Sequence, residues 1–281
     1  MKVLFLGGTG YLGSKLIHKL IAENCSVGCI IRNESSLRRL EDISNKIQFI
    51  PVSSVDEQIP KNYYDCFINT AVKYQKKDTH EADILTVNYQ IPSNIFLNGI
   101  EKNIQKFITI DTGLPKEFNM YSFSKKQFAE LGKWFCKRKE ISFYNIKLEY
   151  FYGEDEPKNR FLQYVINQLI INKDVDLTLG DQKRDFIYID DVLNNLMRLV
   201  KLERKGYWDI PLGTGEGPTV KEAVEYLKSI SGSSSSLNFG AIPKRDNEPD
   251  SVADIKMMQR FDIKINYPWK VGFENLLKGR R

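Results

Sequence analysis

The run YSFSK at residues 121–125 places a phenol and an ammonium group four residues apart. On a helix, positions i and i+4 lie on one face, so Tyr121 and Lys125 can address the same pocket. A nearby cation favours the phenolate form, which suits a tyrosine to exchange a proton with a substrate oxygen. Tyr11 and Lys15 have the same spacing, so spacing alone decides nothing. We prefer Tyr121 because its expected helix follows a predicted strand at residues 106–111.

The second group suited to chemistry is the glycine-rich run GGTGYLG at residues 7–13. It follows a short apolar run and precedes leucines at helical spacing, which places the glycines where a strand turns into a helix. Glycine allows a tight turn, close approach of the backbone to a pyrophosphate, and close packing of helix on strand. A turn that binds nothing is the alternative, but the positive end of the helix dipole favours a bound phosphate. The predicted cofactor contacts in this run are Gly7, Thr9, Gly10, Tyr11, Leu12 and Gly13.

The residue after the second predicted strand, residues 26–31, indicates which dinucleotide binds. Proteins that bind NAD in this way have an acidic residue at this position, which accepts hydrogen bonds from the ribose. Here the position holds Arg32, and a guanidinium pairs well with a 2′-phosphate. Arg38 and Arg39 can assist from a helix expected to begin near Ser35, or can form a solvated face. We therefore predict NADP(H) rather than NAD(H), the alternative being that Arg32 is an ordinary surface charge.

Strands and helices alternate along the first half of the chain. This order predicts an α/β fold with a Rossmann-like, doubly wound parallel sheet. Besides the apolar run that opens the chain, the predicted strands are residues 26–31, 47–52, 66–71, 106–111 and 141–148.

Small and polar residues leave the carboxyl ends of two of these strands, where ligands bind in such sheets. Thr112 leaves the fifth strand, and three further residues leave the fourth. The segment 82–98 is expected to be helical, with a kink or a division at Pro92. The predicted cofactor contacts outside the glycine run and Arg32 are Thr70, Ala71, Val72, Asn88, Tyr121 and Lys125.

Composition excludes several classes of function. The 41 basic and 36 acidic residues leave a net charge of only +5, too small and too dispersed to indicate nucleic acid. With two histidines, a histidine-based triad or a histidine-rich metal site is not expected. Four cysteines without a C-x-x-C pair indicate reduced core residues in a cytoplasmic protein. The first apolar run ends too early for a signal peptide, and no later stretch is long enough to span a membrane.

An ordered series of motifs resembles the extended short-chain dehydrogenase/reductases, also called the NAD-dependent epimerase/dehydratase family. The resemblance covers nearly the whole chain and is more specific than any one motif. Within the family, the chain looks most like the nucleotide-sugar 4-ketoreductases. Besides the two runs above, the motifs are LEYFYG at 148–153, GDQKRDFIYIDDV at 180–192, LGTGEGPTV at 212–220 and FGAIPKRDNEP at 239–249.

The resemblance implies which residues contact the nucleotide sugar. Arg184 and Arg245 are expected at the diphosphate, and Asn159 and Arg160 near the nucleoside. Bidentate recognition of phosphate by arginine makes the first two assignments chemically reasonable.

The chain is expected to form two lobes. Residues 1–155 form the cofactor-binding domain, to which 181–212 are expected to return. Residues 156–180 and 213–281 form a smaller substrate-binding lobe. Family practice also implies a homodimer, formed through the helices at 82–98 and 121–138.

The chain departs from the family pattern at the end of the fifth strand. Members usually have a serine or threonine immediately before the position of Asp111, where this chain has Ile110. Since side chains two apart on a strand point the same way, Thr112 replaces that hydroxyl better than Thr109. Nucleotide-sugar 4,6-dehydratases also place a glutamate after this aspartate, and its absence here counts against dehydration.

These observations predict NADPH-dependent reduction of the C4 ketone of a dTDP- or CDP-linked 4-keto-6-deoxyhexose, in deoxysugar biosynthesis for a surface polysaccharide such as lipopolysaccharide. In this scheme Tyr121 donates the proton to the forming alkoxide, Lys125 promotes that transfer and holds the nicotinamide ribose, and Thr112 orients the keto oxygen. A 4-epimerase that retains NAD is the nearest alternative. A non-catalytic, NADP-sensing regulator of related fold is a second one.

Overall fold

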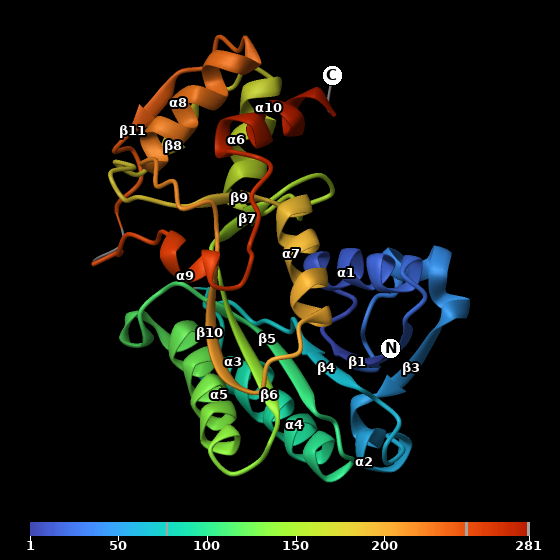
Figure 1. Cartoon of the computed structure of the whole chain (residues 1–281). Helices are drawn as coiled ribbons and strands as arrows, with labels where there is room; N and C mark the ends of the chain where they lie inside the picture. Colours follow the sequence, from blue (N-terminus) through green and yellow to red (C-terminus); the bar gives the residue numbers. More distant parts are fainter. Residues whose placement is uncertain (77, 245–246, 280–281) are drawn as a thin grey trace. The chain divides into compact units, whose positions relative to one another are not determined.

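The computed structural model describes residues 1–76, 78–244 and 247–279 (Figure 1). The chain forms two compact units. Unit 1 contains residues 1–147 and 193–210, and unit 2 contains residues 148–192 and 211–281. No helix in the described part of the chain is both long and apolar enough to cross a bilayer.

Unit 1 is built on a seven-stranded parallel sheet with the order β10-β6-β5-β4-β1-β2-β3. Val3 of β1 pairs with Val27 of β2 on one side and with Cys66 of β4 on the other. The order reverses at β1, so the crevice between the ends of β1 and β4 is the switch point of the sheet. The predicted doubly wound α/β fold is confirmed. The strands are β1 Lys2–Leu6, β2 Ser26–Ile31, β3 Ile47–Pro51, β4 Cys66–Asn69, β5 Lys106–Thr112, β6 Ser142–Leu148 and β10 Gly206–Leu212.

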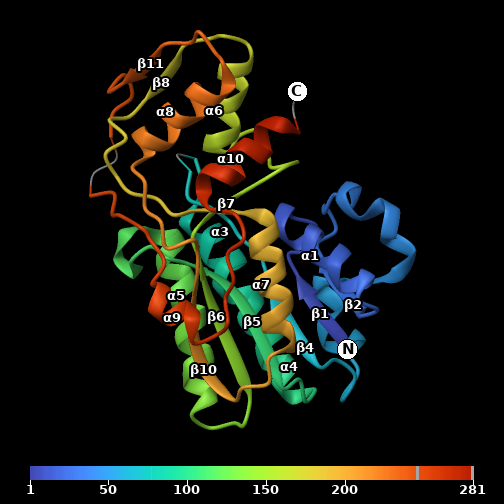
Figure 2. The same ribbon diagram turned by 45° about the horizontal axis from the view of Figure 1, so that its top comes forward.

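Helices cover both faces of this sheet (Figures 1 and 2). Helices α1 and α7 lie on one face, and α3, α4 and α5 lie on the other. The central strands are therefore buried on both sides, which is why they are nearly continuous apolar runs. These helices are α1 Tyr11–Ala22, α3 Glu81–Leu85, α4 Ile91–Glu101, α5 Met120–Cys136 and α7 Ile189–Lys201.

Aromatic packing sets the position of α4 and α5 on the sheet. The ring of Phe96 on α4 lies edge-on to Phe107 of β5 and Phe143 of β6, with centroids 4.6 and 5.5 Å apart. A Cβ atom at Gly132 of α5 would lie 2.4 Å from the ring of Phe143. Glycine therefore lets α5 approach the sheet closely. Nearer the start of the helix, Lys126 reaches the end of β5 and donates to the carbonyl of Thr112.

The predicted division of helix 82–98 at Pro92 is confirmed. The π-helical turn Thr86–Gln90 separates α3 from α4, and Pro92 lies in the first turn of α4. Proline has no N–H to donate to the preceding helical turn, and the wider π-helical turn lies directly before it. The helix expected near Ser35 is instead a 3-10 helix, Arg38–Lys46. The other short elements of unit 1 are the 3-10 turns Val52–Ser54 and Lys116–Phe118 and helix α2 Val55–Gln58.

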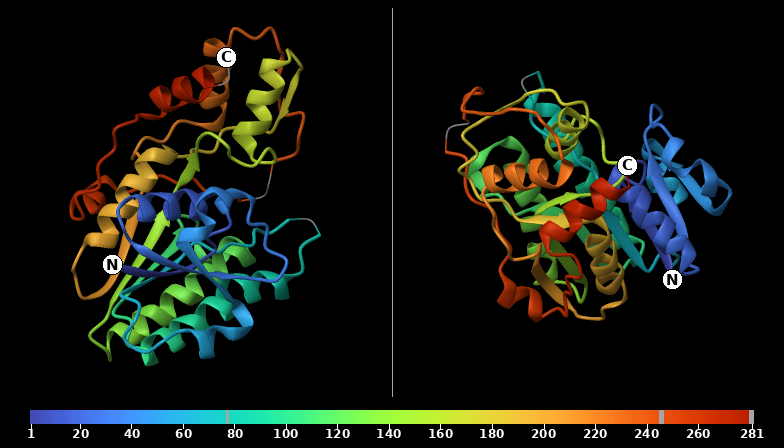
Figure 3. Two further views of the ribbon diagram at one scale, coloured as in Figure 1. Left: turned by 90° about the vertical axis from the view of Figure 1, so that its right-hand side faces the viewer. Right: turned by 90° about the horizontal axis from the view of Figure 1, so that it is seen from above.

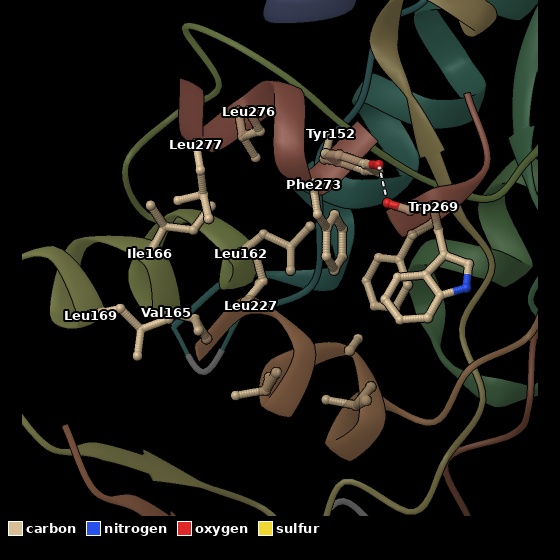
Figure 4. Close-up of a cluster of buried hydrophobic side chains, with 14 of the residues drawn as sticks. Tyr152, Leu162, Val165, Ile166, Leu169, Leu227, Trp269, Phe273, Leu276 and Leu277 are labelled. Carbon is tan, nitrogen blue, oxygen red and sulfur yellow. Dashed lines mark hydrogen bonds between the residues drawn. The ribbon is translucent and has the colours of Figure 1, made fainter. Parts of the chain in front are cut away.

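Unit 2 packs three helices and two small parallel strand pairs around its own core (Figure 3). The aromatic and aliphatic side chains of this core interlock in Figure 4, where the Tyr152 hydroxyl donates to the carbonyl of Trp269 at 3.1 Å. The helices are α6 Phe161–Ile170, α8 Val220–Ser231 and α10 Trp269–Lys278, with the short α9 Ile255–Gln259. The strand pairs are β7 Tyr150–Tyr152 with β9 Phe186–Tyr188, and β8 Val175–Leu177 with β11 Leu237–Phe239.

Candidate active site

Two glycines of the run at residues 7–13 are required by the packing of the protein itself. Gly7 has a φ of +85°, and a Cβ there would lie 2.4 Å from the backbone nitrogen of Ala71. A Cβ at Gly13 would lie 2.3 Å from the carbonyl oxygen of Gly7. Both contacts are shorter than real Cβ contacts, so neither position accepts a side chain without movement of the backbone.

Gly10 differs, because the protein leaves space beside it. A Cβ there would meet only the Gly7 oxygen within 4 Å, at 3.3 Å. Gly10 is the N-cap of α1, which has no side-chain cap and no acidic residue in its first turn. An open cradle at an uncapped helix N-terminus suits an anion. The loop therefore fits the pyrophosphate of a dinucleotide.

The end of β4 is tied to this loop across the switch point. The Thr70 N–H donates to the carbonyl of Leu6 at 2.9 Å, and its hydroxyl lies 3.2 Å from the carbonyl oxygen of Gly7. The next residue, Ala71, donates its N–H to the side chain of Asn69 at 3.0 Å. Thr70 and Ala71, predicted to contact a cofactor, thus lie beside the glycine loop. The side chain of Val72 is exposed.

Tyr121 lies in the first turn of α5, where a reciprocal cap fixes the start of the helix. Asn119 accepts from the N–H of Ser122 at 2.8 Å, and the Ser122 hydroxyl accepts from the N–H of Asn119 at 3.2 Å. One turn later the buried Lys125 donates to the carbonyl of Ala71 at 2.7 Å. The sequence prediction that Tyr121 and Lys125 share one helix is confirmed, and the structure adds that Lys125 contacts the loop after β4.

Burial changes the proton affinity of Lys125. Desolvation lowers the pKa of its ammonium group from 10.5 to about 8, although attraction to Asp111 of β5 acts in the opposite direction. A lysine with such a pKa releases and takes up protons more readily near neutral pH than an exposed one.

The loop after β4 supplies contacts that sequence reasoning missed. The ring of Tyr74 lies against the ring of Tyr121, with centroids 5.1 Å apart. The side chain of Gln75 accepts from the N–H of Met120 at 3.0 Å. No motif signals these residues, because their proximity to α5 depends on the sheet order.

Asn88, a predicted cofactor contact, lies buried in the π-helical turn. Its side chain accepts from the N–H of Lys73 at 2.8 Å and donates to the Lys73 carbonyl at 3.0 Å and the Ser124 hydroxyl at 3.1 Å. Ser124 donates in turn to the carbonyl of Tyr121 at 2.8 Å. Asn88 thus joins the loop after β4 to α5.

The two threonines of β5 differ in their surroundings. The Thr109 hydroxyl accepts from the side chain of Asn69 at 3.2 Å and lies inside the sheet. The Thr112 hydroxyl accepts from the N–H of Leu114 at 3.2 Å, at the carboxyl end of the strand. Because side chains alternate on a strand, Thr112 shares a face with Ile110 and Thr109 does not.

Arg32 follows directly after β2, which ends at Ile31 as predicted. Its side chain is 57% exposed, with Nε 3.3 Å from a carboxylate oxygen of Glu34. Arg39, in the 3-10 helix that follows, places its guanidinium 5.6 Å from the ring centre of Tyr11. Arg39 therefore reaches the first residue of α1, beside the glycine loop.

The arginines expected at the nucleotide sugar belong to unit 2. Arg160 lies 2.7 Å from a carboxylate oxygen of Glu156, and its guanidinium covers the ring of Phe151. Arg184 lies 2.5 Å from a carboxylate oxygen of Glu248 and also donates to two backbone carbonyls. Asn159 is exposed. Arg245 lies outside the described residues.

A buried carboxylate, also missed by sequence reasoning, joins two of the motifs of unit 2. Asp185, in the run at 180–192, accepts from the N–H groups of Thr214 at 2.7 Å and Gly215 at 2.8 Å. A Cβ at Gly213 would lie 2.3 Å from this carboxylate. Gly213 is therefore needed for the loop to close over Asp185.

Comparison with known proteins places the chain in a family. The model of the NAD dependent epimerase/dehydratase family matches residues 3–207. The chain belongs to the NAD dependent epimerase/dehydratase family. This confirms the resemblance inferred from the motifs.

Two curated relatives within this family differ in their activities. The CDP-abequose synthase of Salmonella typhimurium is 31% identical over 294 residues, with 98% of this chain and 97% of the relative covered. The UDP-glucose 4-epimerase of Lactobacillus helveticus is 25% identical over 302 residues, with 90% and 88% covered.

Solved structures of family members have the same fold. The UDP-glucose 4-epimerase of Thermotoga maritima, with UDP-glucose, superposes with a TM-score of 0.85 at 16% identity, over 99% of this chain and 98% of that one. The UDP-glucuronic acid 4-epimerase of Bacillus cereus, with UDP-glucuronic acid and NAD, gives 0.85 at 21% identity and the same coverage.

Proposed function

We propose that the protein is an NADPH-dependent ketoreductase that reduces the C4 ketone of a dTDP- or CDP-linked 4-keto-6-deoxyhexose. The contact between Lys125 and Ala71 carries this proposal, because it brings the lysine of the tyrosine and lysine pair to the carboxyl edge of the sheet. Similarity to CDP-abequose synthases over nearly the full chain supports a deoxysugar nucleotide as substrate.

The residues of α5 perform the proton transfer in this scheme. When bound, NADPH supplies hydride for carbonyl reduction. The phenol of Tyr121 gives its proton to the oxygen that becomes a hydroxyl. The ammonium of Lys125, held in a dry position by Ala71, stabilises the phenolate that remains.

Two arginines support NADP(H) as the cofactor. Arg32 stands where NAD-binding relatives of this topology place an acid, and Arg39 reaches the start of α1. The guanidinium of Arg32 is exposed, so a 2′-phosphate can replace Glu34 as its partner. The Bacillus cereus structure contains NAD, so similarity to it gives no support for NADP(H). The assignment to NADP(H) therefore depends on Arg32 and Arg39.

The surroundings of Asp111 support reduction over dehydration. Its carboxylate is buried, and its oxygens accept from Lys126, Asn145 and the N–H of Thr112. Thr112 stands where, by the resemblance, the 4,6-dehydratases carry a glutamate. A 4-epimerase is the second candidate, favoured by the similarity of the chain to two 4-epimerases.

The proposal also covers the residues that bind the nucleotide sugar and the assembly of the protein. Arg184 and Arg245 bind the nucleotide diphosphate, and Asn159 and Arg160 lie near the nucleoside. On substrate binding, the Arg184 guanidinium leaves the carboxylate of Glu248 and pairs with a phosphate instead. We also propose that the protein is a cytoplasmic homodimer. The exposed apolar side chains of Leu97 on α4 and Trp134 on α5, the two helices expected at the interface, support the dimer.

Consumption of NADPH and NADH by the purified protein tests the function. The dTDP- and CDP-linked 4-keto-6-deoxyglucose substrates are each generated in place by the matching dehydratase. Oxidation with one nucleotide sugar, faster with NADPH, is the expected result. No oxidation, together with copurified NAD and interconversion of two sugars at C4, would replace the ketoreductase by the epimerase.

A further inference from the structure

The peptide of Thr112 is held from both sides at the end of β5. Its N–H donates to Oδ1 of Asp111 at 2.7 Å. Its carbonyl accepts from Nζ of Lys126 at 2.6 Å. Lys126 also donates to Oδ2 of Asp111 at 2.8 Å, so one ion pair holds both ends of the same residue.

This ion pair is shielded from solvent. The side chain of Asp111 is 1% exposed and that of Lys126 is 16% exposed. A second anchor comes from β6, where the buried Asn145 donates to Oδ2 of Asp111 at 2.9 Å and to Asp209 at 2.8 Å. A buried ion pair contributes little net stability compared with apolar residues, whereas its directional bonds restrict geometry. Here these bonds hold the end of β5.

The hydroxyl of Thr112 is left able to donate. It accepts from the N–H of Leu114 through a lone pair, so its own proton remains available for another oxygen. Thr109 has no equivalent support from Lys126, and its hydroxyl is engaged by Asn69 within the sheet.

We propose that Lys126 is a positioning residue, which acts through Asp111 and the Thr112 peptide to aim the Thr112 hydroxyl at the substrate carbonyl oxygen. This inference rests on the proposed ketoreductase function. Lys126 is adjacent in sequence to the catalytic Lys125 but lies on a different face of α5, so the two lysines have separate tasks.

A double-mutant cycle tests this role. Lys126→Met removes both bonds of the ammonium group, and Thr112→Val removes the hydroxyl while keeping the shape of the side chain. Each single change is expected to lower kcat by about 10- to 100-fold and to change the KM for NADPH little. If Lys126 acts through Thr112, the double variant is no slower than Thr112→Val. Lys116→Met removes an exposed ion pair between the 3-10 turn before α5 and Glu130, and serves as the matched control.

The outcomes separate this proposal from the proposed function. Absence of wild-type turnover overturns both. Two results overturn the positioning role alone, provided that the wild type turns over. One is an unchanged kcat in Lys126→Met. The other is a double variant whose loss in kcat is the product of the losses of the two single variants. If Lys126→Met does not fold, Asp111→Asn combined with Lys126→Met leaves no unpaired buried charge and enters the same cycle.

Discussion

The buried charge of Lys125 predicts how the stability of the protein depends on pH. Burial lowers the pKa of Lys125 from 10.5 to about 8 in the folded protein. At about 1.4 kcal/mol per pKa unit, folding with a charged Lys125 costs roughly 3 kcal/mol. Lys125→Met keeps the length of the side chain and removes this cost, at the expense of the hydrogen bond to Ala71.

The sign follows from proton binding. Below pH 8 the lysine is charged in both states, so the full cost is present. Between about pH 8 and 10.5 the unfolded chain binds more protons than the folded one, so this group makes stability rise with pH. We therefore expect the free energy of unfolding of the wild type, minus that of Lys125→Met, to increase by roughly 3 kcal/mol between pH 7 and 10.5.

Urea unfolding of the cofactor-free proteins at several pH values measures this difference. The other titrating groups are common to both proteins and cancel in the comparison. Lys133→Met, which removes an exposed lysine from the same helix, is the control and is expected to show a constant difference. A wild-type minus Lys125→Met difference that stays constant over this range would refute the account of Lys125 as a desolvated ammonium group.

Three further predictions concern the cofactor and the chemical step. Tyr121→Phe is expected to lower kcat by about 10²- to 10⁴-fold, measured as NADPH oxidation, with NADPH binding retained; full turnover would rule out the proton donor. Arg32→Ala is expected to raise the KM for NADPH by about tenfold or more and to leave that for NADH unchanged, because only NADPH carries the 2′-phosphate; an unchanged preference would contradict the assignment. Gly13→Ala is expected to abolish NADPH binding, measured by fluorescence titration, because its Cβ would lie 2.3 Å from the Gly7 oxygen; normal affinity would show that the loop tolerates the displacement.

The local elements of the active site were predictable because their signals are local. The glycine spacing, the apolar run before it and the leucines after it lie within about 20 residues and specify a strand, a turn and a helix. The same holds for the helix that carries Tyr121 and Lys125. Pro92 predicted the division between α3 and α4, although its form as a π-helical turn depends on packing.

The surroundings of the site residues were not predictable in this way. Asn88 remains a predicted cofactor contact, but no sequence signal indicated that its side chain joins Lys73 to Ser124. The expected partner of Arg184 was a nucleotide diphosphate, and its pairing with Glu248 was not foreseen. Such pairs join residues far apart in the chain, and neither composition nor spacing records them.

The sequence by itself determined the family and the α/β architecture, because these depend on residue type and on short-range periodicity. It also named Tyr121 and Lys125 as candidates for proton transfer. Only the tertiary structure decided which groups surround those residues. The sheet order brings the end of β4 beside the glycine loop and Lys125. The close approach of α5 brings Lys126 to Asp111 and Thr112. These contacts follow from the packing of strands and helices against one another, which no short stretch of sequence specifies.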